Sequence, residues 1–265
     1  MELNAILYAA GVMGGLGILF GLILTFASKK FAVPVDERFT LARDAMAGAN
    51  CGACGYPGCD AYALAVVNGE TTIDLCTPGG QKTLDLLAEI MGQTAEVTEP
   101  VVARVLCQGE TGVVKPRYDY NGPETCHTAV GLAGGPTMCQ WSCVGLGDCV
   151  RVCRFDAMKI ENGIVVIDED KCTACGMCVK ECPRSVIKLL PKKARVTVRC
   201  QSLAAPREAR ETCDKACIGC KRCEKACEYD AIHVNNFLAL IDPEKCTLCG
   251  ACVQVCPTKC IEQLP

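Results

Sequence analysis

The sequence predicts an α+β protein in which one N-terminal transmembrane helix precedes a small helical domain and two tandem copies of a cysteine-rich module. Three observations support this prediction. Residues 3–27 carry no charge, residues 154–191 align with residues 228–265 at a constant offset of 74, and 25 of the 265 residues are cysteines. The chain is too long for a disulfide mini-scaffold and poor in aromatic side chains, so the cysteines indicate metal ligands that hold small domains together.

Shifts in composition predict the organisation of the chain. The predicted segments are the anchor at 1–28, the helical domain at 36–92, the first module at 100–191 and the second module at 192–265. Helical spacing covers residues 36–49 and 77–92, and Gly92 is placed to cap the second helix. Apolar runs at 103–109 and 194–202 predict a strand at the start of each module.

The first segment is predicted to cross the bacterial cell membrane once. Residues 3–27 are long enough to span a bilayer, whereas a cleavable signal peptide would be shorter and would follow positive charge. Lys29 and Lys30 come directly after the segment. Because basic residues stay on the cytoplasmic side, we expect the N-terminus outside and the cysteine-rich domains in the cytoplasm, where thiols remain reduced.

Cysteine spacing in the second module predicts two iron–sulfur clusters. The two runs are C-x2-C-x2-C-x3-C at residues 217–227 and the same pattern followed by Pro257 at residues 246–257. Three thiolates at steps of three bind one [4Fe-4S] cluster and the fourth binds its neighbour, the crossed pattern of two-cluster ferredoxins. The two predicted ligand sets are Cys217, Cys220, Cys223 and Cys256, and Cys246, Cys249, Cys252 and Cys227.

The first module follows this ferredoxin-like pattern with one departure. Its upstream run is C-x3-C-x5-C-x3-C, which we interpret as an insertion of "VGLGD" that Gly145 and Gly147 accommodate. Arg154 follows this run, where the downstream run carries Pro183. The crossed sets are then Cys139, Cys143, Cys149 and Cys182, and Cys172, Cys175, Cys178 and Cys153.

A fifth cluster is predicted in the helical domain. Its ligands are Cys51, Cys54, Cys59 and Cys76, and the glycines between them allow backbone N–H groups to approach the sulfides. Four more cysteines precede the two repeats in matched pairs and are either a sixth site or reduced core residues: Cys107, Cys126, Cys200 and Cys213. Cys260 is expected to be a small apolar core residue.

Other kinds of site are not indicated. Zinc sites use C-x2-C pairs that lie far apart, which does not match these runs, so a zinc-stabilised scaffold is the less favoured alternative. His127 and His233 are expected to be isolated, and no catalytic residue is predicted. The weak net charge of −3 argues against nucleic acid as a partner, and no G-x-G-x-x-G or flavin motif indicates nicotinamide or flavin on this chain.

The combination of a single-span anchor, "CGACGYPGCDAYA" and ferredoxin modules with "GLGDCVRVCRFDAM" resembles the B subunit of the Rnf complex over essentially the whole chain. That family belongs to a membrane-bound, ion-pumping ferredoxin:NAD oxidoreductase. The resemblance implies a translocase subunit that itself only transfers electrons, from reduced ferredoxin to integral membrane and flavin- or NADH-binding subunits. We expect the electron to leave through the cluster at Cys51, Cys54, Cys59 and Cys76. A polyferredoxin subunit of a membrane hydrogenase or another reductase is the alternative.

Overall fold

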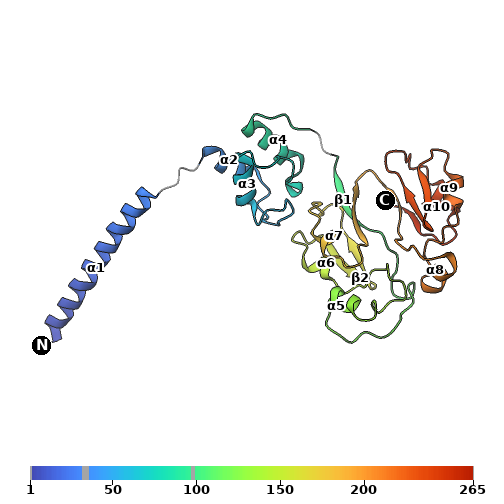
Figure 1. Cartoon of the computed structure of the whole chain (residues 1–265), viewed down its shortest axis with the longest axis horizontal. Helices are drawn as coiled ribbons and strands as arrows, with labels where there is room; N and C mark the ends of the chain where they lie inside the picture. The colour runs from blue at the N-terminus through green and yellow to red at the C-terminus, as the bar shows by residue number, and fades with distance from the viewer. Residues whose placement is uncertain (1, 32–35, 97–98, 265) are drawn as a thin grey trace.

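A computed structural model describes residues 2–31, 36–96 and 99–264 (Figure 1). The helices of its N-terminal part are α1 (Glu2–Lys30), α2 (Glu37–Ala45), α3 (Cys59–Val67), the 3-10 turn η1 (Thr77–Gly79) and α4 (Gly80–Met91). The later helices are α5 (Cys126–Gly131), α6 (Asp148–Arg151), α7 (Met177–Glu181), α8 (Pro206–Thr212), α9 (Arg222–Ala226) and α10 (Ala251–Val255). The strands are β1 (Val101–Val105), β2 (Met158–Glu161), β3 (Ile164–Ile167), β4 (Ile187–Pro191), β5 (Val196–Val198), β6 (Ile232–Asn235), β7 (Leu238–Ile241) and β8 (Ile261–Gln263).

The N-terminal helix α1 matches the predicted membrane anchor. Its stretch from Ala10 to Lys30 has a mean hydropathy of 2.0 and is not buried against the rest of the chain. Large apolar side chains such as Leu16, Phe20 and Leu24 are exposed along it. By length and composition this helix can therefore cross a bilayer, and its own last turn carries Lys29 and Lys30.

The helices α2, α3 and α4 form a small unit with an apolar core. The side chains of Tyr62 and Leu87 are fully buried in it, and α2 packs against both other helices. The Tyr62 hydroxyl donates to the Thr72 carbonyl at 2.9 Å and accepts from the Leu75 N–H at 3.2 Å, which satisfies its buried polar atom. Gly92 caps α4 in the left-handed conformation, as expected, whereas the spacing of apolar residues did not predict α3.

The rest of the chain repeats one plan twice. We call residues 101–191, from β1 to β4, module 1 and residues 196–263, from β5 to β8, module 2. In each module the first strand pairs with the last in an antiparallel ladder, β1 with β4 and β5 with β8. A hairpin lies between them, β2–β3 in module 1 and β6–β7 in module 2. Each expected strand is present, although both are shorter than the apolar runs that predicted them.

Glycine permits one close backbone approach in module 1. The β2–β3 hairpin turns through Asn162 and Gly163, which both have positive φ, as a two-residue turn of this kind requires. Gly145 packs against this turn so closely that a Cβ atom on it would lie 2.2 Å from the Gly163 carbonyl oxygen. Gly145 therefore brings the loop before Cys149 against the hairpin.

The two modules share a core. Val114 and Cys139 of module 1 pack with the buried residues of module 2, and the Val114 backbone bridges to Cys213. Arg199 of module 2 donates to the Val105 carbonyl at 3.2 Å and to the Cys107 carbonyl at 3.1 Å. These contacts place the two modules side by side as one body, to the right in Figure 1.

Candidate iron–sulfur centres

The spacing of the sulfur atoms fits iron–sulfur clusters better than zinc. All 25 cysteines are free thiols, and only Cys220 and Cys249 among them are exposed. No three cysteine sulfurs of the described residues lie within 4.8 Å of one another. A zinc ion with Zn–S bonds of about 2.3 Å holds its four sulfurs about 3.8 Å apart. The cysteine groups of the described residues are therefore too open for that zinc geometry, and a larger group such as the [4Fe-4S] cubane remains the one that the spacing of the runs predicts.

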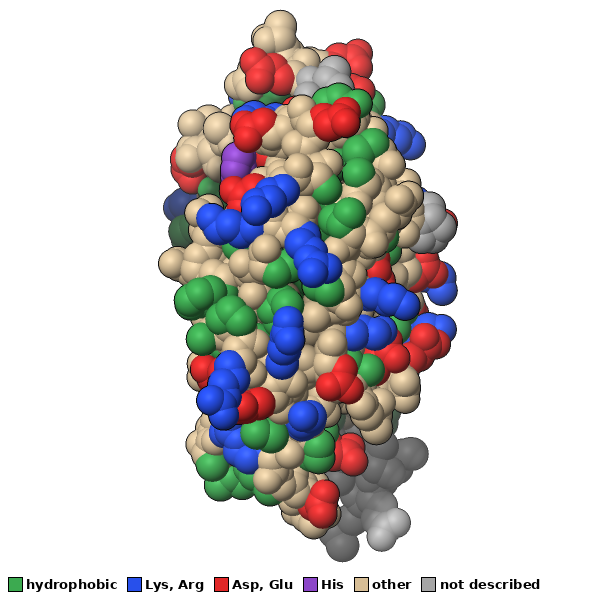
Figure 2. Space-filling view, turned by 90° about the vertical axis from the view of Figure 1, so that its right-hand side faces the viewer, with side chains coloured by type: hydrophobic (Ala, Val, Ile, Leu, Met, Phe, Trp, Pro, Cys, Tyr) green, Lys and Arg blue, Asp and Glu red, His purple; other side chains and the backbone are tan. Residues whose placement is uncertain are grey.

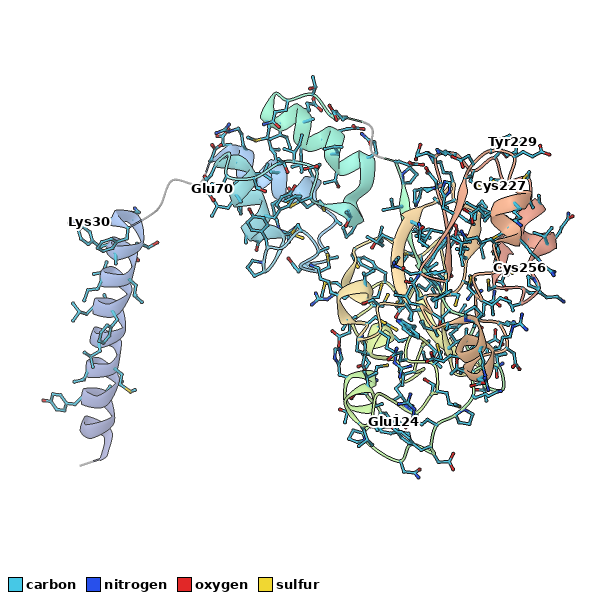
Figure 3. The ribbon with its side chains drawn as sticks, turned by 45° about the vertical axis from the view of Figure 1, so that its right-hand side comes forward. Lys30, Glu70, Glu124, Cys227, Tyr229 and Cys256 are labelled. Atoms are coloured by element: carbon cyan, nitrogen blue, oxygen red, sulfur yellow. The ribbon has the colours of Figure 1, made fainter. Side chains whose placement is uncertain are left out.

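Four groups of four cysteines each line a separate small cavity. We number the sites outward from the membrane anchor. The four are site 2 (Cys153, Cys172, Cys175, Cys178), site 3 (Cys126, Cys143, Cys149, Cys182), site 5 (Cys217, Cys220, Cys223, Cys256) and site 6 (Cys227, Cys246, Cys249, Cys252). Sites 2, 5 and 6 have the membership that the spacing predicts. Figure 3 shows Cys227 and Cys256, one ligand of each site in module 2, on different parts of the module.

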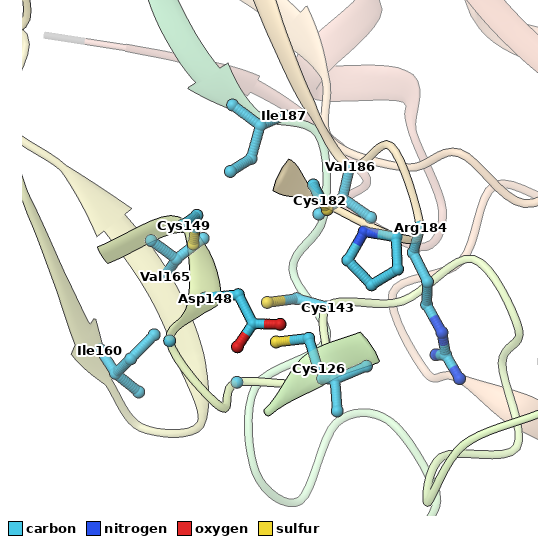
Figure 4. Close-up of a pocket in the computed structure, with 14 residues that line it drawn as sticks. Cys126, Cys143, Asp148, Cys149, Ile160, Val165, Cys182, Arg184, Val186 and Ile187 are labelled. Carbon is cyan, nitrogen blue, oxygen red and sulfur yellow. The ribbon is translucent and has the colours of Figure 1, made fainter. Parts of the chain in front are cut away.

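Site 3 differs from the expected set by one residue. The cavity is lined by Cys126, at the start of α5, and Cys139 does not line it (Figure 4). The spacing of the run predicts Cys139 in this group, whereas the structure places Cys126 beside Cys143, Cys149 and Cys182.

The repeat itself carries the signal for this correction. At the offset of 74, Cys143 and Cys149 correspond to Cys217 and Cys223, and Leu146 stands where module 2 has Cys220. The run "VGLGD" is therefore no insertion: module 1 lacks one cysteine. The α5 segment supplies the replacement from outside the run.

Site 4 combines two cysteines from each module. Its members are Cys107, Cys139, Cys200 and Cys213, all of them buried. The Cys107 sulfur accepts the Cys143 N–H at 3.4 Å, and the Cys200 sulfur accepts the Cys217 N–H at 3.3 Å. Cys139 packs in one core with Cys200 and Cys213, and burial, together with the nearby thiols of Cys139 and Cys107, raises the pKa of the Cys213 thiol to about 11. Of the four matched cysteines named in the sequence, Cys126 lies at the cavity of site 3, and Cys139 lies near the other three.

Site 1 lies at the edge of the helical unit and faces module 1. Cys54, Cys59 and Cys76 pack against the core of α2–α4, and Cys51 begins the same loop. Arg154 of module 1 donates to the Ala49 carbonyl at 3.2 Å and to the Asn50 carbonyl at 2.9 Å.

A neighbouring contact extends this docking to the ligands. Cys51 lies close enough to Cys175 of site 2 for its charge to act on that thiol. Arg154 follows Cys153 at the position where the downstream run has a proline. Its hydrogen bonds therefore hold the loop of site 1 against site 2.

Cys260 is a buried core residue that also contacts a predicted ligand of site 5. It is buried, it lines site 5, and its sulfur lies 3.6 Å from the Cys256 sulfur. This hydrogen bond lowers the pKa of Cys256 to about 5. The corresponding residue in module 1 is Val186, which has no such group.

Burial makes several of the other candidate ligands weaker acids. Burial raises the pKa of Cys149, Cys178 and Cys200 to about 12 and that of Cys143 and Cys213 to about 11. Such thiols are protonated at neutral pH, so each releases a proton when it binds iron.

His127 is not isolated, contrary to expectation. Atoms of His127, Asp148 and Glu181 lie within 4.8 Å of one another, each one residue from a cysteine of site 3. The buried Asp148 carboxylate accepts the His127 backbone N–H at 3.1 Å and pairs with Arg151, so it is already satisfied within the protein. His233 likewise lies 3.5 Å from Asp230.

Three family comparisons match the cysteine-rich parts of the chain. Residues 46–78 match the family described as "Putative Fe-S cluster", residues 165–188 a 4Fe-4S binding domain, and residues 216–260 a 4Fe-4S dicluster domain. These matches agree with the cavities at sites 2, 5 and 6 and with the loop of site 1.

Curated relatives match almost the whole chain. The B subunit of the Na(+)-translocating ferredoxin:NAD(+) oxidoreductase complex of Acetobacterium woodii is 45% identical over 260 residues, 98% of this chain and 78% of the relative. The B subunit of an ion-translocating oxidoreductase complex of Methanosarcina acetivorans is 38% identical over 98% of both chains. The chain belongs to the family of Rnf B subunits. The B subunit of the proton-translocating complex of Clostridium ljungdahlii is 38% identical over 99% of this chain and 94% of its own length.

Membership in the family of Rnf B subunits decides between the two redox interpretations. The chain is an iron–sulfur electron-transfer subunit of an ion-translocating oxidoreductase complex, and the resemblance noted in the sequence is confirmed. The alternative of a hydrogenase polyferredoxin is therefore set aside. The apolar helix α1 agrees with the membrane association of such complexes.

Proposed function

We propose that the chain holds six [4Fe-4S] clusters in single file and relays electrons from reduced ferredoxin to the membrane partners of an Rnf-type complex. A bound [4Fe-4S] cluster supplies one-electron redox chemistry. The two modules would then be tandem two-cluster ferredoxin-like units, with site 4 between them and site 1 in the helical unit. The observation that carries this proposal is the chain of direct contacts between neighbouring sites.

Each step of that order rests on a contact. Site 1 meets site 2 through Arg154 and through Cys51 beside Cys175. Sites 2 and 3 exchange ligands by the crossed pattern, as do sites 5 and 6. The N–H groups of Cys143 and Cys217 donate to two sulfurs of site 4 from its two sides. Site 4 therefore bridges sites 3 and 5.

Exposure supports entry of electrons at module 2. Cys220 of site 5 and Cys249 of site 6 are the exposed cysteines, so bound clusters would approach the surface there. Lys221, Arg222 and Lys225 follow Cys220 and are exposed. Figure 2 shows Lys and Arg side chains over the middle of the right-hand face of the molecule, with Asp and Glu side chains toward its upper end and right edge. The basic side chains would suit an acidic electron carrier such as ferredoxin.

The other end of the relay lies next to the anchor. Site 1 belongs to the first unit after α1, so electrons would leave there toward integral membrane subunits and the flavin- or NADH-binding subunits beyond them. The basic last turn of α1 supports an N-terminus outside the cell, with α1 in the lipid bilayer and all six sites in the cytoplasm.

Anaerobic iron counting on the purified complex tests the proposal. A fully loaded chain should contain about 24 iron atoms, four for each of six clusters, and every cluster should accept an electron from dithionite in an EPR titration. An iron content near 20 atoms that stays constant on reconstitution would show that site 4 holds no cluster. A colourless, EPR-silent chain would remove the whole proposal.

Replacing Arg154 with alanine should slow electron transfer into site 1. The change removes both hydrogen bonds that hold the Ala49–Asn50 backbone against module 1, so the distance from site 2 to site 1 is no longer fixed. We expect an unchanged iron content and a slower, less uniform reduction of site 1. Freeze-quench EPR measures the rate of this reduction. Arg207→Ala, which removes an exposed arginine of α8 outside the proposed ferredoxin contact, is the control, and equal rates in the two variants would contradict the docking role.

A further inference from the structure

Arg184 is a buried cation without a carboxylate partner. Its side chain is 8% exposed, and its guanidinium donates only to neutral oxygens. These acceptors are Thr137 Oγ1 at 2.7 Å, the Cys139 carbonyl at 2.8 Å, the Ser142 carbonyl at 3.0 Å, Ser142 Oγ at 3.1 Å and the Gly134 carbonyl at 2.5 Å. None of the described carboxylates pairs with it. A buried charge of this kind is costly unless another charge compensates it.

The guanidinium lies between two of the proposed cluster sites. Arg184 follows Cys182 by two residues and contributes to the wall of site 3. Its acceptors on Cys139 and Ser142 belong to the segment 139–143, which supplies one ligand to site 4 and one to site 3. Figure 4 shows its side chain beginning at the wall of site 3 and extending away from the sulfur atoms of that site.

The fold reserves space for this side chain. Gly135 has φ +97°, and a Cβ atom on it would lie 2.2 Å from Arg184 Nη2. Module 2 has no equivalent, because the residue at the same position of the repeat is Thr258. The cation is therefore specific to the side of the relay that lies nearer the membrane.

A four-thiolate [4Fe-4S] cluster is negatively charged in both oxidation states and gains one more negative charge on reduction. Net charge near a cluster is one of the main determinants of its reduction potential. Arginine remains protonated in proteins, so its charge is present throughout the redox cycle. We propose that Arg184 is the shared counter-charge of sites 3 and 4 and raises the reduction potential of both. Electrons that arrive from module 2 are thereby drawn across the module boundary. This inference rests on the proposed assignment of the two sites.

Two variants separate charge from hydrogen bonding. Arg184→Lys keeps the charge, Arg184→Gln removes it, and both lose the forked contacts to the 139–143 backbone. In a spectroelectrochemical titration followed by EPR, Arg184→Gln should disfavour reduction of two clusters about tenfold, a shift of about 59 mV for one electron, relative to Arg184→Lys. The other four clusters should not shift. Arg117→Gln, which removes a nearby but exposed arginine, should leave all midpoints unchanged.

The outcomes distinguish a counter-charge role of Arg184 from a role in backbone positioning alone. Loss of iron from sites 3 and 4 in Arg184→Gln alone would also support the counter-charge role. Equal midpoints in the two Arg184 variants, or equal loss of iron from both, would overturn it and leave only backbone positioning. The wild-type titration separates this inference from the proposed function. If the wild type shows five clusters, site 4 holds no cluster. The midpoint potential of the cluster at site 3 must then still differ between Arg184→Gln and Arg184→Lys.

Discussion

A Cys139→Ala variant should lose one cluster and interrupt the relay between the two modules. Cys139 is the module 1 cysteine that packs in one core with Cys200 and Cys213. We expect a loss of about four iron atoms per chain. Electrons supplied by ferredoxin should still reduce sites 5 and 6, but ferredoxin-dependent NAD reduction by the complex should nearly stop, because electron tunnelling falls steeply with distance.

Two further variants serve as comparisons for Cys139→Ala. Cys126→Ala should also lose about four iron atoms, from site 3, because it removes a ligand that the spacing of the run does not reveal. Cys260→Ala removes a buried cysteine that lines site 5 without belonging to the ligand set, and it should keep the full iron content and turnover. Full iron content and turnover in Cys139→Ala would show that site 4 holds no cluster.

Removal of iron should unfold the two modules and spare the helical unit. The helices α6, α7, α9 and α10 have four or five residues each, far below the length of about 12 at which an isolated helix becomes marginally stable. The sheets have two strands each, and cysteines form a large part of both module cores. Without the clusters, little apolar surface remains to offset the entropy of the chain.

Hydrogen exchange measured by mass spectrometry before and after anaerobic chelation tests this expectation. Amides of β1, β4, β5 and β8 should lose their protection. Amides of α3 and α4 should keep much of theirs, because Tyr62, Leu84 and Leu87 form a core that does not depend on metal. Protection of the β1–β4 ladder that survives complete iron removal would contradict a metal-dependent fold.

Local spacing predicted the groups of cysteines that line three of the cavities. Sites 2, 5 and 6 each have three cysteines at steps of three residues and a fourth from the neighbouring run, as in two-cluster ferredoxins. The cavity of site 3 differs from the group that spacing predicts in one position, because Leu146 breaks the run and Cys126, which lines the cavity, lies far upstream. The alignment of Cys143 with Cys217 was available in the sequence, but a spacing rule applied to one run does not use it.

The spacing of cysteines within one run does not predict site 4. Its four proposed ligands come from two copies of the repeat, and only the packing of module 1 against module 2 brings these cysteines together. The docking of Arg154 on the Ala49–Asn50 backbone has the same origin, since it depends on how two units meet. The anchor, the repeat and the strands at the start of each module were predictable because they follow from hydropathy and periodicity within one segment.

The division of site 4 between two halves of the chain sets an order for biogenesis. Site 1 lies within the first 76 residues and can be loaded while the ribosome is still translating the remainder. Cys213 is synthesised long after Cys107, and site 5 must await Cys256, near the end of translation. If the proposed sites are loaded as their ligands are synthesised, sites 1 to 4 are completed before sites 5 and 6, and a truncated polypeptide would lack the two sites at which we propose that electrons enter.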